Sequence, residues 1–235
     1  GLHLAGKVAP LNKKISLEMG GKNPVIVMPD ADLDLAMDAI LWAAFGTTGQ
    51  RCTACSRVIL VDPVGDAFVK KLAGKAASLR LGPGSDPRSD VAALINETAL
   101  KKVEQYVEIG LKQDKAKLIC GGKRAAKGAL AKGNFFEPTI FDHVKQGMRI
   151  EQEEIFGPVL SVIRVKSYEE AMEVANGVAY GLSASIFTSD VTLTQRFQND
   201  SESGLCYINM GTTGAEVGVP FGGVKGTGNR HREGG

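Results

Sequence analysis

The sequence predicts an α/β fold, a three-layer domain in which a mostly parallel sheet carries helices on both faces. Short apolar runs of strand length alternate with amphipathic segments of about 10–15 residues throughout the chain. No internal repeat and no flexible linker divides the 235 residues. Strands that alternate with helices imply right-handed crossovers between parallel neighbours, so we expect one large compact unit.

In the first third of the chain, residues 23–30, NPVIVMPD, are typical of a short buried strand that ends in a turn. The spacing then becomes helical, with apolar residues at 33, 36, 37, 40, 41, 44 and 45. Asp30 or Asp32 is the expected N-cap, and Gly46 and Gly49 bound the other end. Residues 57–62, RVILVD, predict a second buried strand, and residues 67–81 predict a second helix.

Further along, residues 82–90 are rich in Pro, Gly, Asp and Ser and predict a surface loop. We expect helices at about 97–112, 168–179 and 191–199, and strands at 116–122, 182–189 and 204–210. Residues 135–144 are expected to be extended. The small, basic and glycine-containing stretch 123–134 is expected to be an exposed excursion.

Composition excludes several classes of function. The formal net charge is +2, from 28 basic and 26 acidic residues without long runs, so we expect no nucleic-acid partner. The basic stretch KGTGNRHR, residues 225–232, is a local exception that we interpret as local structure. No apolar run reaches the ~20 residues that span a bilayer, so we expect no membrane partner. Four cysteines are too few for a disulfide scaffold, and a cytoplasmic location is the simplest expectation.

The stretch GQRCTACSRV, residues 49–58, contains a C-x-x-C spacing with four interpretations: a redox pair, half of a zinc site, a reactive thiol beside a bystander, or two buried cysteines. The three histidines, at 3, 143 and 231, are scattered, so we predict no metal site. Thiol–disulfide motifs usually begin a helix after a strand, whereas here a helix precedes the cysteines and a strand follows them.

Cys52 is the strongest candidate nucleophile, because it follows Gly-Gln-Arg in a turn where Arg51 and nearby amides would favour the thiolate. Cys120 and Cys206 lie inside apolar runs and are expected to be small buried residues. A thiol that forms an acyl intermediate needs a base to activate water. Glu18, followed closely by two glycines, is the candidate, although a solvated turn carboxylate accounts for its pattern equally well.

Several stretches together resemble the aldehyde dehydrogenase superfamily. LEMGGKNP (17–24) resembles the family's glutamate motif, and FGTTGQRCTACSR (45–57) resembles its cysteine motif. EEIFGPVL (153–160), YGLSASIFT (180–188) and PFGGVKGTGNRHREGG (220–235) resemble three further blocks, in the same order. The resemblance covers essentially the whole chain and implies the fold of the family's catalytic domain.

The resemblance also implies an activity: oxidation of an aldehyde to a carboxylic acid with NAD or NADP. Cys52 matches the nucleophile that forms a thiohemiacetal and then a thioester, and Glu18 matches the base that hydrolyses it. Glu154 matches the residue that holds the nicotinamide ribose, Phe156 the ring beside the nicotinamide, and Gly20 a further cofactor-binding position. Cys55 stands where the family usually has glycine; we hypothesise that it traps an oxidised Cys52 as a disulfide.

The resemblance also predicts the extent of the chain. Residues 1–16 match the end of the coenzyme-binding domain, and residues 17–235 match the catalytic domain, with the C-terminal oligomerisation arm incomplete. We therefore expect a fragment that binds NAD(P) poorly and is inactive as a dehydrogenase. The full-length protein is expected to be a homo-oligomer.

The substrate is predicted only in outline. Arg51, Gly214 and Ala215 resemble the pattern of family members that act on carboxylate-bearing semialdehydes, in which an arginine and backbone amides hold the distal carboxylate. A structural salt bridge is the other interpretation of Arg51. Two alternatives to a dehydrogenase remain: a cofactor-free thiol esterase, and a non-catalytic structural or interaction module.

Overall fold

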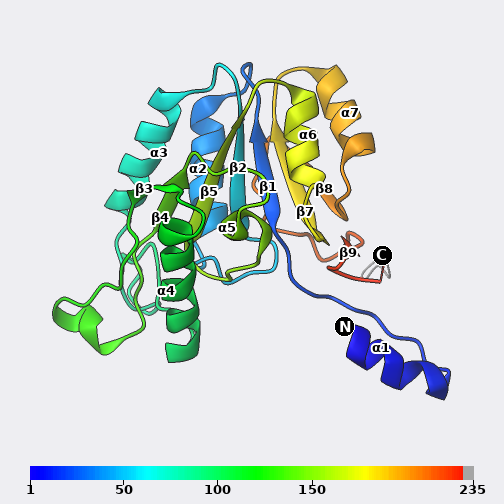
Figure 1. The fold of residues 1–235 in the computed structure, drawn as a ribbon, viewed down its shortest axis with the longest axis horizontal. Helices are drawn as coiled ribbons and strands as arrows, with labels where there is room; N and C mark the ends of the chain where they lie inside the picture. Colours follow the sequence, from blue (N-terminus) through cyan, green and yellow to red (C-terminus); the bar gives the residue numbers. More distant parts are fainter. Residues whose placement is uncertain (230–235) are drawn as a thin grey trace.

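The computed structural model describes residues 1–229 and is built around a seven-stranded sheet (Figure 1). The strands lie in the order β3-β4-β5-β2-β1-β7-β8, and all neighbours are parallel except β3 and β4. The strands are β1 (Asn23–Val27), β2 (Cys55–Val61), β3 (Lys117–Cys120), β4 (Thr139–Asp142), β5 (Val159–Val165), β7 (Ser183–Phe187) and β8 (Leu205–Ile208). A small antiparallel pair is formed by β6 (Tyr180–Gly181) and β9 (Val224–Lys225).

Helices cover both faces of this sheet. One hydrophobic core joins it to α2 (Leu33–Phe45) and α3 (Asp66–Ser78). The core on the other face joins it to α4 (Glu97–Lys112), α5 (Arg149–Gln152), α6 (Tyr168–Asn176) and α7 (Val191–Asp200). The predicted three-layer α/β architecture is therefore confirmed.

Side chains of the central strands alternate between the two cores, as the pleat of a strand requires. In β1, Val25 and Val27 belong to the core with α2 and α3, whereas Ile26 faces the opposite core. All five residues of β1 are buried. After the polar Asn23, residues 24–27 are all apolar, as expected for a parallel strand covered on both faces.

The parallel arrangement brings distant segments together at the amino ends of the central strands. Glu18 precedes β1, Cys52 precedes β2, and residues 154–156 precede β5. Because β1, β2 and β5 are parallel members of one sheet, these three segments enter it on the same side, at the amino ends of the strands. All the predicted catalytic residues therefore approach the amino ends of these strands.

Local details agree with the capping rules. Asp32 is the N-cap of α2 and accepts hydrogen bonds from the amides of Asp34 and Leu35. Asp30, the other candidate cap, instead accepts bonds from Thr188 and Ser189 after β7. The stretch 123–134 contains a short 3-10 helix, η2 (Gly128–Lys132), in which no residue is buried, as expected of an exposed excursion.

Some expectations were incomplete or wrong. The central strand β5 was not singled out from the sequence, which drew attention only to the motif that leads into it. Cys120 and Cys206 are half-buried rather than buried, because β3 and β8 form the two edges of the sheet. Lys225, at the start of the basic stretch, forms an ion pair with Glu202. Residues 230–232 of that stretch lie outside the described residues.

The first helix stands apart from the sheet. Figure 1 shows α1 (Leu2–Val8) joined to β1 by an extended segment, and none of its residues is buried. A short 3-10 helix, η1 (Ala9–Leu11), follows it. That residues 1–16 belong to a separate coenzyme-binding domain stays a prediction. In the described part of the chain, no helix combines the length and apolar character needed to cross a membrane.

Candidate active site

Cys52 lies in the tight loop between α2 and β2. The loop turns through Thr48 and Gly49, both with positive φ. Gly49 has a φ of +66°, and a Cβ there would lie 2.0 Å from the carbonyl oxygen of Gly157, so only glycine fits. This close approach packs the Cys52 loop directly against the segment before β5.

The Cys52 thiol is half-buried, and burial raises its pKa above the ordinary value. Hydrogen bonds from the amides of Thr53 and Cys52 itself oppose this shift, and the negative charges of Glu154 and Glu18 add to it. The prediction that nearby amides favour the thiolate is therefore supported as a contribution, although the net direction is upward.

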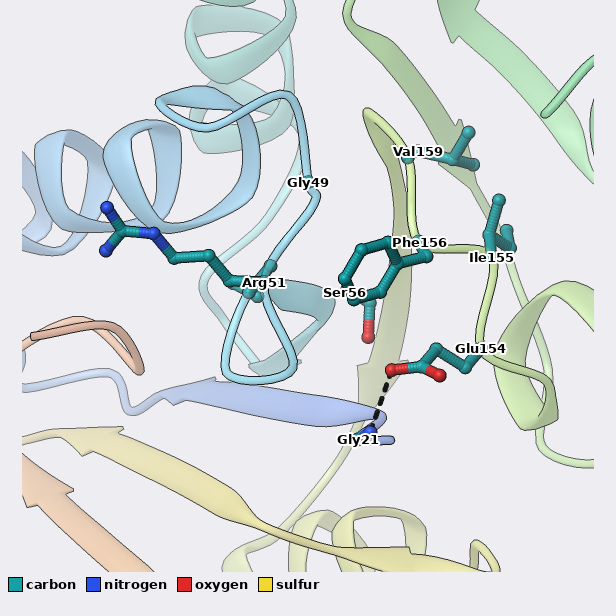
Figure 2. A pocket seen from close by; sticks show the side chains of 11 residues that line it. Gly21, Gly49, Arg51, Ser56, Glu154, Ile155, Phe156 and Val159 are labelled. Atoms are coloured by element: carbon teal, nitrogen blue, oxygen red, sulfur yellow. Dashed lines mark hydrogen bonds between the residues drawn. The ribbon is translucent and has the colours of Figure 1, made fainter. Parts of the chain in front are cut away.

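That Arg51 favours the thiolate stays a prediction. The Arg51 side chain is exposed, and the largest influences on the Cys52 pKa come from burial, from the amides of Thr53 and Cys52, and from the charges of Glu154 and Glu18. Figure 2 shows the Arg51 side chain pointing away from Glu154 and Phe156.

Glu18 is exposed and lies in a segment fastened to the end of the described chain. Glu18 forms an isolated antiparallel bridge with Gly228, and the amide of Met19 donates to the carbonyl of Thr227. The Thr227 hydroxyl donates to the carbonyl of Gly20 at 2.7 Å. These contacts hold Glu18 where its charge reaches Cys52.

Glu154 is held against the glycine pair of the first motif. The Gly21 amide donates to Oε1 of Glu154 at 2.9 Å (Figure 2). A Cβ on Gly20 would lie 2.3 Å from Oε2 of Glu154. The Nζ of Lys102 donates to the Glu154 carbonyl at 2.9 Å, so both the main chain and the side chain of Glu154 are anchored.

Phe156 presents its ring to a hollow that it lines with Glu154, Gly21 and Arg51 (Figure 2). Its backbone has a φ of +60°, which is uncommon for an aromatic residue. The neighbouring Ile155 is 3% exposed, whereas Phe156 is 41% exposed. This backbone conformation therefore places one side chain in the core and the next, large and apolar, at the surface of the hollow.

Cys55 differs sharply from Cys52. It is the first residue of β2 and is 2% exposed. Its Sγ donates to the carbonyl of Arg57 at 3.4 Å, and burial raises the pKa of the Cys55 thiol to about 12. A buried thiol that remains protonated is a poor redox partner, so the structure favours the interpretation of Cys55 as a bystander.

A buried charged group next to the site was missed by the sequence reasoning. Arg57 is fully buried and forms an ion pair with Glu151 at 2.8 Å. Its guanidinium also donates to the carbonyls of Lys22, Val174 and Ala175. Lys22 itself is 2% exposed, its Nζ has no hydrogen-bond partner, and burial lowers its pKa to about 7. The sequence does carry a sign of this buried charge, because Arg57 directly precedes the apolar residues 58–61 of a predicted buried strand.

Gly214 and Ala215 are exposed and line a different hollow, with β8 and residues 216–220. Arg51 lines the hollow that contains Glu154, so the three predicted substrate residues do not share one pocket. The loop is nevertheless attached to the loop that contains Cys52, because the Thr212 hydroxyl donates to the carbonyl of Thr53 at 2.7 Å.

Comparison with known proteins finds relatives that match this chain along nearly all of its length. The sequence model of the Aldehyde dehydrogenase family matches residues 1–235. The chain is 45% identical to alpha-ketoglutarate semialdehyde dehydrogenase of Haloferax volcanii over 213 residues, which are 91% of this chain and 44% of that protein. It is 42% identical to alpha-ketoglutaric semialdehyde dehydrogenase of Bacillus subtilis, over 94% of this chain and 45% of that protein.

Among solved structures, betaine aldehyde dehydrogenase from Staphylococcus aureus in complex with NAD+ superposes with a TM-score of 0.95 at 35% identity. The match covers 100% of this chain and 46% of that one. The chain thus spans slightly less than half the length of the relatives it matches.

Proposed function

The chain belongs to the aldehyde dehydrogenase family, and from this premise we propose that it is the catalytic domain of an enzyme that oxidises an aldehyde to a carboxylic acid with NAD or NADP. One observation carries the proposal. The half-buried thiol of Cys52 and two carboxylates, those of Glu18 and Glu154, come from separate segments to the amino ends of neighbouring parallel strands. The charges of both carboxylates raise the pKa of the thiol.

Cys52 is proposed as the nucleophile. Its sulfur forms a bond to the aldehyde carbon, giving a tetrahedral thiohemiacetal whose oxygen carries the negative charge. Backbone amides beside the sulfur are suited to stabilise that charge, and one such donor is typically worth ~3–4 kcal/mol in the transition state. Loss of hydride from the adduct leaves a thioester on Cys52. The thiolate is the attacking form, so the Cys52 proton passes to water before attack, and the raised pKa of the thiol makes this proton loss less favourable.

Glu18 is proposed as the base for the second half of the reaction. Its carboxylate takes a proton from water, the water oxygen attacks the thioester carbon, and the carbon–sulfur bond breaks to release the acid and the thiol. The exposed position of Glu18 gives it access to water, and its anchoring through Met19 and Gly20 holds it near Cys52. General-base catalysis of this kind typically contributes about 10²–10⁴-fold.

The residues present fit an NAD(P) cofactor. Oε1 of Glu154 is fixed by Gly21, and the carboxylate borders a hollow where it can accept hydrogen bonds from sugar hydroxyls. The 41% exposed ring of Phe156 offers a flat apolar surface to a nicotinamide. Gly20 leaves the space that the Glu154 carboxylate occupies. When bound, the nicotinamide would accept the hydride.

The substrate is proposed to be a semialdehyde with a distal carboxylate. Two relatives named for alpha-ketoglutarate semialdehyde support this, as does the exposed guanidinium of Arg51. Among residues 1–229, the Arg51 side chain forms no ion pair, and its guanidinium is therefore available to a substrate. The ratio of semialdehyde to neutral-aldehyde turnover should fall in Arg51→Ala; an unchanged ratio removes the carboxylate proposal.

The test of the whole proposal separates its two halves. In the full-length protein, Cys52→Ser should abolish NAD(P)H production. Glu18→Gln should keep a stoichiometric burst of NAD(P)H but lose steady-state turnover about 10²–10⁴-fold. Mass spectrometry should then find the acyl group on the peptide that contains Cys52. Full steady-state turnover in Glu18→Gln would contradict the assigned base.

The two alternatives give different results in the same assays. A thiol esterase would hydrolyse an activated ester without nucleotide and lose that activity in Cys52→Ser. A structural module would show no alkylation of Cys52. That the 235 residues alone are inactive as a dehydrogenase, and that the full-length protein is a homo-oligomer, stay predictions.

A further inference from the structure

Asn23 is a buried amide that the proposed reaction does not use. It is the first residue of β1 and is 1% exposed. Its Nδ2 donates to two carbonyls of the nucleophile loop, that of Cys52 at 2.7 Å and that of Ala54 at 2.9 Å. Its Oδ1 accepts from the amide of Ser183, the first residue of β7, at 3.1 Å. One side chain therefore joins the amino ends of β1, β2 and β7.

The bond to the Cys52 carbonyl fixes the orientation of one peptide unit. That carbonyl and the N–H of Thr53 belong to the same planar trans peptide, so they point in opposite directions. Holding the oxygen toward Asn23 therefore turns the Thr53 N–H away from Asn23. The amide of Thr53 is the largest of the influences that favour the Cys52 thiolate. Asn23 therefore holds the carbonyl of the same peptide whose N–H favours the Cys52 thiolate.

Packing confines this peptide on one side, and the hydrogen bond from Asn23 sets its orientation. A Cβ on Gly21 would lie 2.4 Å from the Cys52 carbonyl oxygen, so the main chain of β1's entry segment already abuts it. The amide of Ala54 donates to the carbonyl of Arg51 at 3.0 Å, which closes the turn. Without the Asn23 amide, the part-buried Cys52 carbonyl would lose this hydrogen bond.

We propose that Asn23 is a positioning residue that aims the Thr53 N–H at the Cys52 sulfur by holding the carbonyl oxygen of the same peptide. The same N–H serves the thiolate before attack and borders the developing negative charge afterwards. Asn23 makes no contact with substrate in this assignment; it acts through the peptide between residues 52 and 53. The proposal rests on Cys52 being the nucleophile.

The test measures the rate of Cys52 alkylation by iodoacetamide against pH in the full-length protein, read by mass spectrometry of the peptide that contains Cys52. Charged groups that influence this thiol, Glu154 and Glu18, are left intact in every variant. In Asn23→Ala, we expect the midpoint of the pH profile to rise by about one unit, so that the rate near neutral pH falls about tenfold. At high pH, where the thiol is fully ionised, the rates should converge.

The chain offers a matched control. The Thr212 hydroxyl holds the carbonyl of Thr53, the next peptide along, whose N–H belongs to Ala54 and donates to Arg51 rather than to the thiol. Thr212→Val removes one anchor from the same loop, yet should leave the midpoint unchanged. Asn23→Ser, whose hydroxyl can still donate one hydrogen bond, should give an intermediate midpoint and serves if Asn23→Ala does not fold.

The outcomes are distinguishable. A raised midpoint in the Asn23 variants and not in Thr212→Val supports the proposal. An unchanged midpoint in folded Asn23 variants overturns it, as does an equal shift in Thr212→Val, which would indicate general loosening of the loop. Failure of Cys52 to alkylate in the unmodified protein would instead contradict the proposed function.

Discussion

The amide of Gly21 and the carboxylate of Glu154 form a 2.9 Å hydrogen bond that joins segments 133 residues apart. Both residues line the proposed cofactor site, and the second carboxylate oxygen lies where a Cβ on the adjacent Gly20 would collide with it. The arrangement of Glu154 therefore depends on two backbone positions in another motif.

Gly20→Ala should displace the Glu154 carboxylate, because its added Cβ would lie 2.3 Å from Oε2. The flexible side chain can move, so we expect the free energy of unfolding to fall by only about 1 kcal/mol. Affinity for NAD+ or NADP+, measured by calorimetry on the full-length protein, should weaken about tenfold or more, as when a charge-assisted hydrogen bond is lost. Gly74→Ala, at a helical glycine with open space around it, should leave affinity unchanged.

Glu18→Gln should have opposite effects on the two halves of the reaction. The Glu18 charge contributes to the raised pKa of Cys52, so removing it should lower that pKa and speed alkylation of Cys52 near neutral pH. Thioester hydrolysis should slow in the same variant. Glu104→Gln, which removes an exposed carboxylate of α4, should change neither rate. Slower alkylation in Glu18→Gln would show that its charge does not oppose the thiolate.

Glu151→Gln should destabilise the protein far more than loss of a surface ion pair. Arg57 and Glu151 are both fully buried, so removing one charge leaves the other uncompensated, at a typical cost of about 3–5 kcal/mol. The exposed pair Arg196 and Glu169 provides the comparison, and Glu169→Gln should cost about 0–1 kcal/mol. Denaturant unfolding measures both. Similar losses would mean that water reaches the Arg57 site.

Lys22 should make stability increase with pH above neutrality. Its pKa is about 7 in the folded protein, because of burial and then the nearby Arg57, against 10.5 for an ordinary lysine. Between these values the unfolded chain binds the extra proton, so stability rises with pH by up to about 1.4 kcal/mol per unit. The slope from about pH 7 to 8.5 should be smaller in Lys22→Met. Equal slopes in the two proteins would contradict a neutral buried amine.

Cys55→Ala should leave the redox behaviour of Cys52 unchanged. Cys55 is 2% exposed and the pKa of its thiol is about 12, so it supplies almost no thiolate to an oxidised Cys52. Peroxide treatment followed by reductant should therefore restore Cys52 alkylation to the same extent with and without Cys55. Recovery that requires Cys55 would support the trapping hypothesis instead.

The sequence by itself predicted most of the strands and helices in their order, because short apolar runs and a period of 3.6 residues report burial in a sheet or along a helix; the central strand β5 was not among them. It also determined the family, since five motifs in order carry it. It indicated Cys52, Glu18 and Glu154 as candidates through those motifs. These residues come together at the amino ends of the strands because β1, β2 and β5 are parallel neighbours, and the spacing in the sequence did not show this.

Only the tertiary structure decided which way each side chain faces. The Arg51 side chain adjoins Cys52 in sequence yet points away from Glu154 and Phe156, and Cys55 shares the motif of Cys52 yet is buried. Conversely, Asn23 reaches the Cys52 loop from 29 residues away. Contacts of this kind depend on strand register and loop conformation, which are set by the packing of the whole sheet, and so no local pattern encodes them.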